Sequence, residues 1–258
     1  MYWMIWTILF LAALLLIFMV KEAFHNRVKK EELAFPDFPK QWGELTIFFI
    51  SDIHKRLVHE TIIQNIKGKA DIVVIGGDLT EGGVPLSRTR KNIEMLQQAA
   101  PVFFIWGNND YEINTGKLNK LFRECGVTVL KNEAAFLQKG ESSIALIGLD
   151  DHEPSEPSLR AILHSLDDRH FKILLSHKPF ILDAIRKSDN IALVLSGHTH
   201  GGQIRLFGFG PYQRGRTFHH FNTTILISNG YGTTLLPLRL GAPAETHLVT
   251  IKHAEGQK

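Results

Sequence analysis

Five short polar clusters, rich in aspartate, asparagine and histidine, each follow an apolar run of the chain. They are Asp52-Ile53-His54, Asp78, Asn108-Asn109-Asp110, His177 and His198-Thr199-His200. Carboxylate, amide and neutral imidazole groups supply oxygen and nitrogen donors without thiolate, a set that suits borderline divalent ions such as Mn, Fe or Zn. On an extended segment, side chains two residues apart point the same way. Each pair, Asp52 with His54 and His198 with His200, can therefore bind at one site.

Each cluster taken alone also has an ordinary structural explanation. An aspartate after a strand often caps a helix, which would suffice for Asp52 or Asp78. His177 stands before Lys-Pro, as a turn residue does. His198 and His200 are flanked by Gly197, Gly201 and Gly202, and glycine lets backbone and ions approach closely. The five clusters together favour the interpretation as a metal site.

The elements that must position these residues are short apolar runs rich in Ile, Val and Phe. Runs of this kind are typical of strands buried on both faces, and amphipathic segments lie between them, which predicts an α/β fold. After Gly201 the pattern is mostly β, with strands in "TTILISNG" and "THLVTIK". Because ligands bind beyond the carboxyl ends of strands in open α/β sheets, the clusters should meet at one edge. The predicted strands are 45–51, 71–77, 101–107, 143–149, 171–176 and 191–197.

Residues 1–20 carry no charge, and about twenty apolar residues are what a helix needs to cross roughly 30 Å of hydrocarbon. Trp3 and Trp6 suit one membrane interface and Lys21 the other. A cleaved signal is the alternative, but no basic segment precedes the apolar run and no small-x-small site follows it. We therefore expect a single-pass anchor in the cell membrane, and the basic residues from Lys21 to Lys30 predict that the large domain after it is cytoplasmic.

The whole chain has 258 residues, and the part that follows the anchor is long enough for one large domain. We expect a juxtamembrane basic segment and linker at 21–44, a folded domain at 45–252 and a tail at 253–258. Apart from the cluster after the anchor, basic and acidic residues balance, which argues against a nucleic-acid partner. The single cysteine, Cys125, is expected to pack in an amphipathic segment rather than to do redox chemistry.

In order, the motifs "DIH", "GGD", "GNND", "SH" and "GHTH" resemble those of the calcineurin-like metallophosphoesterase superfamily. The tail, with "GHTHGGQ", "SNGYG" and the segment 237–245, resembles a bacterial membrane-associated subgroup. The resemblance implies a four-layer α/β/β/α sandwich and two divalent metal ions. It also implies the ligands: Asp52, His54 and His200 for the first ion, Asn108, His177 and His198 for the second, and Asp78 bridging both.

The resemblance further implies hydrolysis of a phosphoester or pyrophosphate bond by hydroxide held between the ions. The implied catalytic residues are Asp78, His198 and, in the acid's position, Asn109. The anchor suggests a lipid or envelope precursor as the substrate. Two alternatives are a cyclic-nucleotide or nucleic-acid phosphodiesterase, and a scaffold of the same fold that catalyses nothing; the complete ligand set argues against the scaffold.

One position departs from the family pattern. Related chains carry a histidine at the third motif that contacts phosphate or protonates the leaving group, and Asn109 stands there. An amide donates a hydrogen bond but cannot deliver a proton as imidazolium, and general acid catalysis is typically worth about 100- to 10,000-fold. His152 is a candidate replacement, with a surface role as its alternative, and His219 and His220 are similarly ambiguous. Arginines that could hold a second phosphate are Arg205, Arg214, Arg216 and Arg239.

Overall fold

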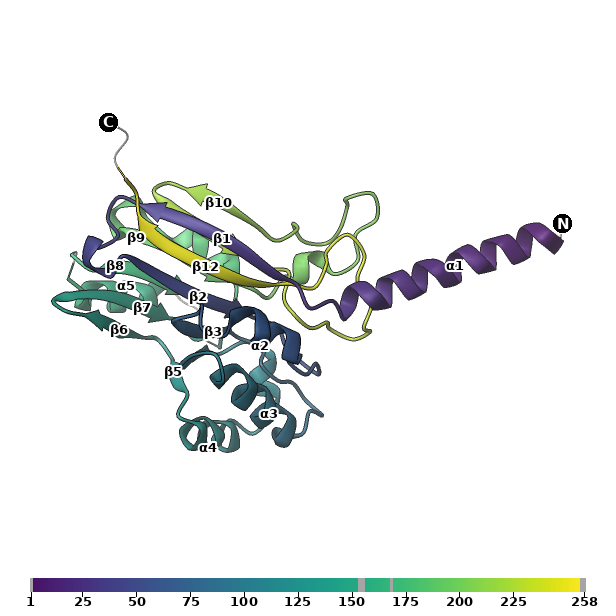
Figure 1. The fold of residues 1–258 in the computed structure, drawn as a ribbon, viewed down its shortest axis with the longest axis horizontal. Coiled ribbons are helices and arrows are strands. Elements are labelled where there is room, and N and C mark those ends of the chain that lie inside the picture. Colours follow the sequence, from purple (N-terminus) through teal and green to yellow (C-terminus); the bar gives the residue numbers. More distant parts are fainter. Residues whose placement is uncertain (1, 153–155, 168, 256–258) are drawn as a thin grey trace.

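The computed structural model describes residues 2–152, 156–167 and 169–255. Two six-stranded mixed sheets pack face to face, and helices cover their outer faces (Figure 1). This is the predicted α/β/β/α sandwich.

The first sheet has the order β1-β12-β2-β3-β4-β5, and its central strands β2 to β5 are parallel. Parallel neighbours need crossover connections, and here α2, α3 and α4 supply them. The strands are β1 (Val28–Phe35), β2 (Glu44–Ile50), β3 (Ile72–Gly76), β4 (Val102–Ile105), β5 (Thr128–Leu130) and β12 (Thr246–His253); the helices are α2 (Glu60–Ile66), α3 (Leu86–Gln97) and α4 (Thr115–Cys125).

The second sheet has the order β10-β11-β9-β8-β7-β6, with β7, β8, β9 and β11 parallel and antiparallel strands at both edges. The helix α5 (Glu156–Ser165) connects β7 to β8. The strands are β6 (Glu133–Lys139), β7 (Ser142–Gly148), β8 (Phe171–Leu175), β9 (Ile191–Ser196), β10 (Arg216–His220) and β11 (Thr223–Ile227); short 3-10 helices are Lys40–Trp42, Asn109–Glu112, Pro179–Ala184, Lys187–Asp189 and His200–Gly202.

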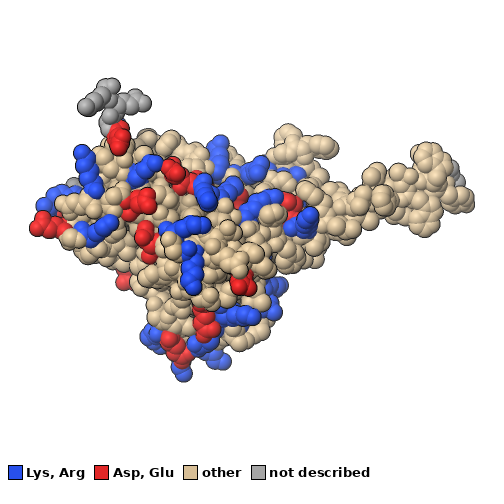
Figure 2. Space-filling view, viewed as in Figure 1, with Lys and Arg blue, Asp and Glu red and all other residues tan. Residues whose placement is uncertain are grey.

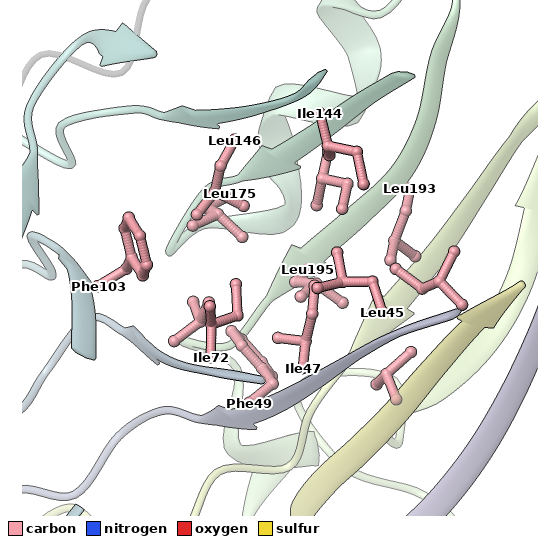
Figure 3. Packing of buried hydrophobic residues seen from close by; sticks show 14 of the residues in the cluster. Leu45, Ile47, Phe49, Ile72, Phe103, Ile144, Leu146, Leu175, Leu193 and Leu195 are labelled. Carbon is pink, nitrogen blue, oxygen red and sulfur yellow. The ribbon is translucent and has the colours of Figure 1, made fainter. Parts of the chain in front are cut away.

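Alternation along the strands divides the core into three layers. On β2, Ile47 and Phe49 face the second sheet, whereas Phe48 and Ile50 pack under α2 to α4. Figure 3 shows the layer between the sheets, where Phe49 lies among Ile47, Ile72 and Leu195. Leu159 of α5 belongs to the third layer, against the second sheet. Strands buried on both faces hold the residues at their ends in fixed positions.

The helix α1 (Tyr2–Ala23) projects away from the sandwich, and its side chains are exposed along nearly its whole length (Figure 1). Its length and apolar composition suffice to cross a membrane. Its last turns contact the domain: the Arg239 N–H donates to the Met19 carbonyl at 3.1 Å, and the Arg56 guanidinium donates to the carbonyls of Ala23 at 3.1 Å and Phe24 at 2.6 Å.

Part of the expected linker at 21–44 is a strand. Residues 28–35 form β1, which pairs with β12 in parallel along its full length. The Lys29 ammonium lies 2.7 Å from Glu245 Oε2. Lys29, which was expected to be in the basic segment next to the membrane, therefore forms an ion pair on the first sheet. The four consecutive charged residues at 29–32 suit an edge strand exposed to water, and they are why this segment resembles a linker in sequence. Of the expected tail, His253 ends β12 and 256–258 lie outside the described residues.

Candidate metal centre

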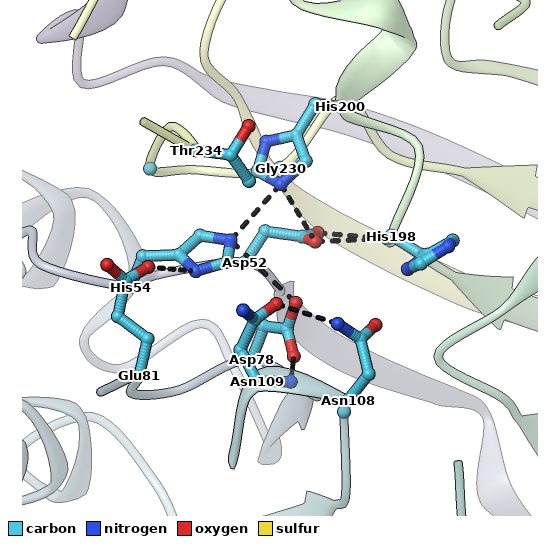
Figure 4. Close-up of polar contacts among 12 residues, drawn as sticks. Asp52, His54, Asp78, Glu81, Asn108, Asn109, His198, His200, Gly230 and Thr234 are labelled. Atoms are coloured by element: carbon cyan, nitrogen blue, oxygen red, sulfur yellow. Dashed lines mark hydrogen bonds and ion pairs between the residues drawn. The ribbon is translucent and has the colours of Figure 1, made fainter. Parts of the chain in front are cut away.

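The five clusters converge at one edge of the sandwich, beyond the carboxyl ends of β2, β3, β4, β8 and β9 (Figure 4). Asp52, His54 and His200 form one compact group, whose potential ligand atoms all lie within 4.8 Å of one another. His54 Nε2 is 3.1 Å from His200 Nε2, and His200 Nε2 is 3.4 Å from Asp52 Oδ1. These are the three residues that the sequence assigned to the first ion.

A second group shares Asp52 with the first and adds Asp78 and His177, again within 4.8 Å. The Asp78 Oδ2 atom of the second group lies 3.3 Å from His177 Nε2 and 3.8 Å from His54 Nε2 of the first group. His198 Nδ1 is 3.3 Å from His177 Nε2. The arrangement gives two adjoining donor sets with aspartates between them.

Asn108 supplies an independent test of whether a cation fits here. Its amide nitrogen donates to Asn109 Oδ1 at 2.8 Å, which fixes the orientation of the side chain. Its Oδ1 atom is buried and has no hydrogen-bond partner among the residues that the structure describes. A buried acceptor without a donor is costly, and a divalent cation would satisfy it. The donor set therefore fits the metal ions that the family implies.

The backbone at the centre is unusual, since Asp52, His54, Asp78, His198 and His200 all have φ between 50° and 68°. This left-handed region is sparsely populated by residues other than glycine, and each such residue costs of the order of 1–3 kcal/mol. Glycines make room beside them: a Cβ on Gly107 would lie 2.3 Å from Asp78 Oδ1, and one on Gly197 would lie 2.5 Å from Asp52 Oδ2.

Further contacts orient the histidine rings. His54 Nδ1 is 2.8 Å from Glu81 Oε2, and His177 Nδ1 is 2.8 Å from the Gly76 carbonyl. The His177 Nδ1–H donates to that carbonyl, and the Glu81 carboxylate lies beside His54 Nδ1, so in both rings Nε2 is the atom that faces the centre. The sequence analysis missed Glu81, although its place three residues after Asp78 was a signal.

Asp110 joins the loops that follow β3 and β4. Its carboxylate accepts the backbone N–H groups of Gly107 at 2.9 Å, Asp78 at 2.8 Å and Thr80 at 3.0 Å. Burial and the neighbouring Asp78 carboxylate raise the pKa of Asp110 to about 8. The last residue of the "GNND" motif therefore positions Asp78 rather than facing the centre itself.

Arg239 is buried and organises the C-terminal loops. Its guanidinium donates to the carbonyls of Asn229 at 2.6 Å, Gly232 at 2.7 Å and Ala242 at 2.8 Å, and lies 3.1 Å from His200 Nδ1. It therefore serves as a support and not as one of the arginines that could hold a second phosphate. Arg205 likewise donates to the Gly201 carbonyl at 3.2 Å.

Electrostatics separate the histidines into two kinds. Burial and the charge of Arg239 lower the pKa of His200 to about 3, and burial and the neighbouring His177 lower the pKa of His198 to about 4. Burial also acts on His177, but Asp78 and Asp52 outweigh it and raise its pKa to about 10. Because ligands bind metal as neutral imidazole, loading of the centre must release the His177 proton.

Asn109 stands at the rim of the centre. Its backbone N–H donates to Asp78 Oδ1 at 2.8 Å, and its side-chain amide donates to Glu112 Oε1 at 2.8 Å. His152 is exposed, with its ring 4.8 Å from that of Tyr111. His219 lies on the edge strand β10, where its Nδ1 is 3.2 Å from the Thr224 hydroxyl. His219 and its neighbour His220 thus belong to the sheet edge.

A two-sheet sandwich that gathers aspartate, histidine and asparagine donors at its strand ends defines the class of metal-dependent phosphoesterases. The sequence profile of one family, described as calcineurin-like phosphoesterase, matches residues 45–202. The chain belongs to this calcineurin-like phosphoesterase family and is a hydrolase of it.

Relatives extend along most of the chain. An uncharacterized protein of Bacillus subtilis, YpbG, is 47% identical over 209 residues, which cover 80% of this chain and 81% of the relative. The phosphodiesterase YaeI of Escherichia coli is 28% identical over 86% of this chain and 87% of its own. Among solved structures, a phosphopantetheinyl hydrolase of Mycobacterium tuberculosis shares the fold, with a TM-score of 0.52 at 15% identity over 72% of this chain and 89% of that chain.

Proposed function

We propose that the chain is a membrane-anchored phosphoesterase that uses two divalent ions to hydrolyse a phosphoester or pyrophosphate bond. The observation that carries this proposal is the position of the Asp78 carboxylate between His54 and His177, at 3.8 Å and 3.3 Å. A carboxylate with histidines on both sides is what a bridging ligand requires. Asn108 Oδ1, buried without a partner among the described residues, supports the same reading.

The proposed roles follow the two donor groups. Asp52, His54 and His200 would hold one ion and Asn108, His177 and His198 the other, and the Asp78 carboxylate would serve both. Two divalent ions held in this way supply the charge that activates water and stabilises phosphoryl oxygens during displacement. Manganese, iron and zinc all suit these donors.

The protein's own residues orient the histidine rings of this arrangement. Glu81 fixes the ring of His54, and the Gly76 carbonyl fixes that of His177. The Asn109 side chain is a neutral amide that donates to Glu112 Oε1 in this structure, and it cannot protonate a leaving group. The centre therefore suits a leaving group that needs little protonation, such as a phosphate.

Membrane anchoring through α1 is part of the proposal. Its exposed apolar length supports a single span, and the basic residues after it support a cytoplasmic domain. A substrate with a lipid-linked phosphate would then meet the enzyme at the bilayer. The even charge balance of the domain gives no support to a nucleic-acid substrate.

Metal content and hydrolysis test the proposal on the full chain in detergent. The protein is stripped of metal, reloaded with Mn²⁺ and analysed for bound metal, then assayed on bis-p-nitrophenyl phosphate and p-nitrophenyl phosphate. Asp78→Asn should bind less metal and lose about 100-fold or more in kcat/KM, because it weakens both sites at once. Asp183→Asn, a change at an exposed carboxylate, is the matched control. A wild type that binds no metal and equals Asp78→Asn on every substrate would refute the enzyme proposal.

A further inference from the structure

Two loops beside the base of α1 present large apolar side chains to solvent. The loops are 204–212 and 233–237, and we call them together the apolar rim. Phe207 is 98% exposed, Leu235 93% and Phe209 81%. Leu206, Tyr212 and Leu236 are exposed as well. Burying large apolar side chains is favourable, and a cluster of exposed ones marks a binding surface.

The backbone at the two tips is strained. Phe207 has φ of 50° and Leu235 has φ of 57°. Bulky residues rarely adopt this left-handed conformation, because it is strained. Backbone strain therefore occurs at the two residues of the rim whose side chains are most exposed. A surface that buries these side chains would offset that cost.

The rim is held in shape by hydrogen bonds. Leu206 and Phe209 exchange two backbone bonds, of 2.9 Å and 2.8 Å, that close a tight hairpin. The Gln203 side chain donates to the carbonyls of Thr234 at 3.1 Å and Leu236 at 3.2 Å, and accepts from the Thr234 N–H at 2.9 Å. The last residue of "GHTHGGQ" therefore ties one loop to the other, three positions after His200.

The rim stands where the membrane surface must be. The helix α1 has 22 residues, which at ~1.5 Å each span ~33 Å, close to the ~30 Å of a hydrocarbon core. The Met19 carbonyl, inside this helix, already accepts the Arg239 N–H of the domain. No spacer is left between the span and the loops, and Figure 1 shows them surrounding the base of α1.

The charges agree with this placement. Neither loop contains Asp or Glu, and Arg205 is their single charged residue. The Arg205 guanidinium is turned inward to the Gly201 carbonyl at 3.2 Å. Figure 2 shows the projecting part of α1 without charged residues, in contrast to the far end of the domain; the charged residues of this helix, Lys21 and Glu22, lie in its last turn beside the domain. An uncharged surface at the level of a span matches a lipid bilayer as its partner.

From these observations we infer that the apolar rim inserts into the bilayer interface next to α1. The domain then contacts the membrane through three elements, the helix α1 and the two loops of the apolar rim, instead of through α1 alone. Apolar side chains of interfacial segments enter the headgroup and acyl boundary by about 5–10 Å. The inference rests on the proposed anchoring, and it adds that the candidate metal centre faces substrates at headgroup level.

Site-specific labelling tests the inference in the full chain. Cys125→Ala removes the single cysteine, and an environment-sensitive nitrobenzoxadiazole label is attached after Phe207→Cys or Leu235→Cys. Phe136→Cys, on β6 at the end of the domain opposite α1, is the matched control (Figure 1). The proteins are reconstituted in vesicles of phosphatidylcholine and phosphatidylglycerol, with or without lipids that carry a doxyl quencher in the acyl chain.

Labels at 207 and 235 should emit at shorter wavelength and be quenched several-fold more than the label at 136. Equal quenching at all three positions would overturn the inference. A blue shift that ignores the lipid quencher and grows with protein density would overturn it too, because a second copy would then cover the rim. The intact mass of the protein tests the anchor separately from the rim. If α1 is cleaved, the mass falls and the proposed anchoring fails, whereas a docked rim would still be quenched by the labelled lipid.

Discussion

At the scale of single residues, the candidate centre depends on conformations that the chain must be forced to adopt. Asp52, His54 and Asp78 each have a left-handed backbone. In an isolated peptide these residues would relax to ordinary values, so the buried strands that hold them provide the constraint. The donors are therefore positioned before any ion arrives, and ion binding requires the loss of a proton more than a change of shape.

The substitution Asn109→His restores the acid that the family pattern contains. A histidine beside Asp78 Oδ1 could protonate a departing oxygen, a contribution typically worth about 100-fold or more. We expect kcat to rise for alkyl phosphate esters and to change little for nitrophenyl esters, which need no acid. Asn109→Ala is the control, because it loses the contact to Asn108 without adding an acid. Equal effects on both ester classes would show that residue 109 lies away from the scissile bond.

Glu81 is expected to act through His54. Glu81→Gln keeps the shape of the side chain but weakens the acceptor for the His54 Nδ1–H, and loss of such a partner typically costs 10- to 100-fold in metal affinity. Titration of the metal-free protein with Mn²⁺ measures this directly. Glu81 also pairs with Lys55 at 2.8 Å, so Lys55→Ala tests whether the effect comes from that ion pair. If Lys55→Ala weakens Mn²⁺ binding as much as Glu81→Gln does, Glu81 does not act by orienting His54.

At the scale of elements, sequence and structure agree where strands are buried. The expected strand at 45–51 is β2 (44–50), and that at 191–197 is β9 (191–196). These matches are close because a continuous apolar run is typical of a strand that is buried on both faces of a sheet. Edge strands were missed: β1 and β6 carry charged and polar residues on faces exposed to water. Glu81 and the supporting role of Arg239 escaped prediction for a related reason, since their partners are distant in sequence and no local pattern reveals them.

The missed strand β1 has a measurable consequence. His247 on β12 lies 2.9 Å from Glu31 of β1 and 3.5 Å from Glu245. Burial lowers the pKa of His247, but these two carboxylates outweigh it and raise the pKa above its ordinary value. Because the pKa of His247 is higher in the folded than in the unfolded protein, its protonation stabilises the fold. This stabilisation is complete below the unfolded-state pKa of about 6.5 and is lost as the pH rises through the folded-state pKa.

We therefore expect His247→Gln to lower the free energy of unfolding by about 1–3 kcal/mol at pH 6, and by less as the pH increases. Urea unfolding with a chelator present measures the difference between the two proteins, and the metal centre contributes equally to both. A difference that stays constant from pH 6 to pH 9 would assign His247 a packing role alone.

At the scale of the whole molecule, orientation remains a prediction from the basic residues after α1. Fusion of green fluorescent protein after Lys258 should give fluorescent cells, and fusion of alkaline phosphatase at the same place should give inactive enzyme, if the domain is cytoplasmic. The reverse pair of results would place the domain outside. Either result leaves the apolar rim on the membrane, because the rim and the base of α1 lie at the same end of the domain.

The hydrogen bond from the Arg239 N–H to the Met19 carbonyl joins the domain directly to the last turns of α1. A domain held flat against lipid searches for substrate in two dimensions, and its encounters depend on how crowded the plane is with substrate. Dilution of a lipid-linked substrate with inert lipid should then slow the reaction at constant bulk concentration, whereas adding more vesicles of the same composition should not. The rate would be governed by mole fraction in the leaflet, so membrane composition itself would control the enzyme.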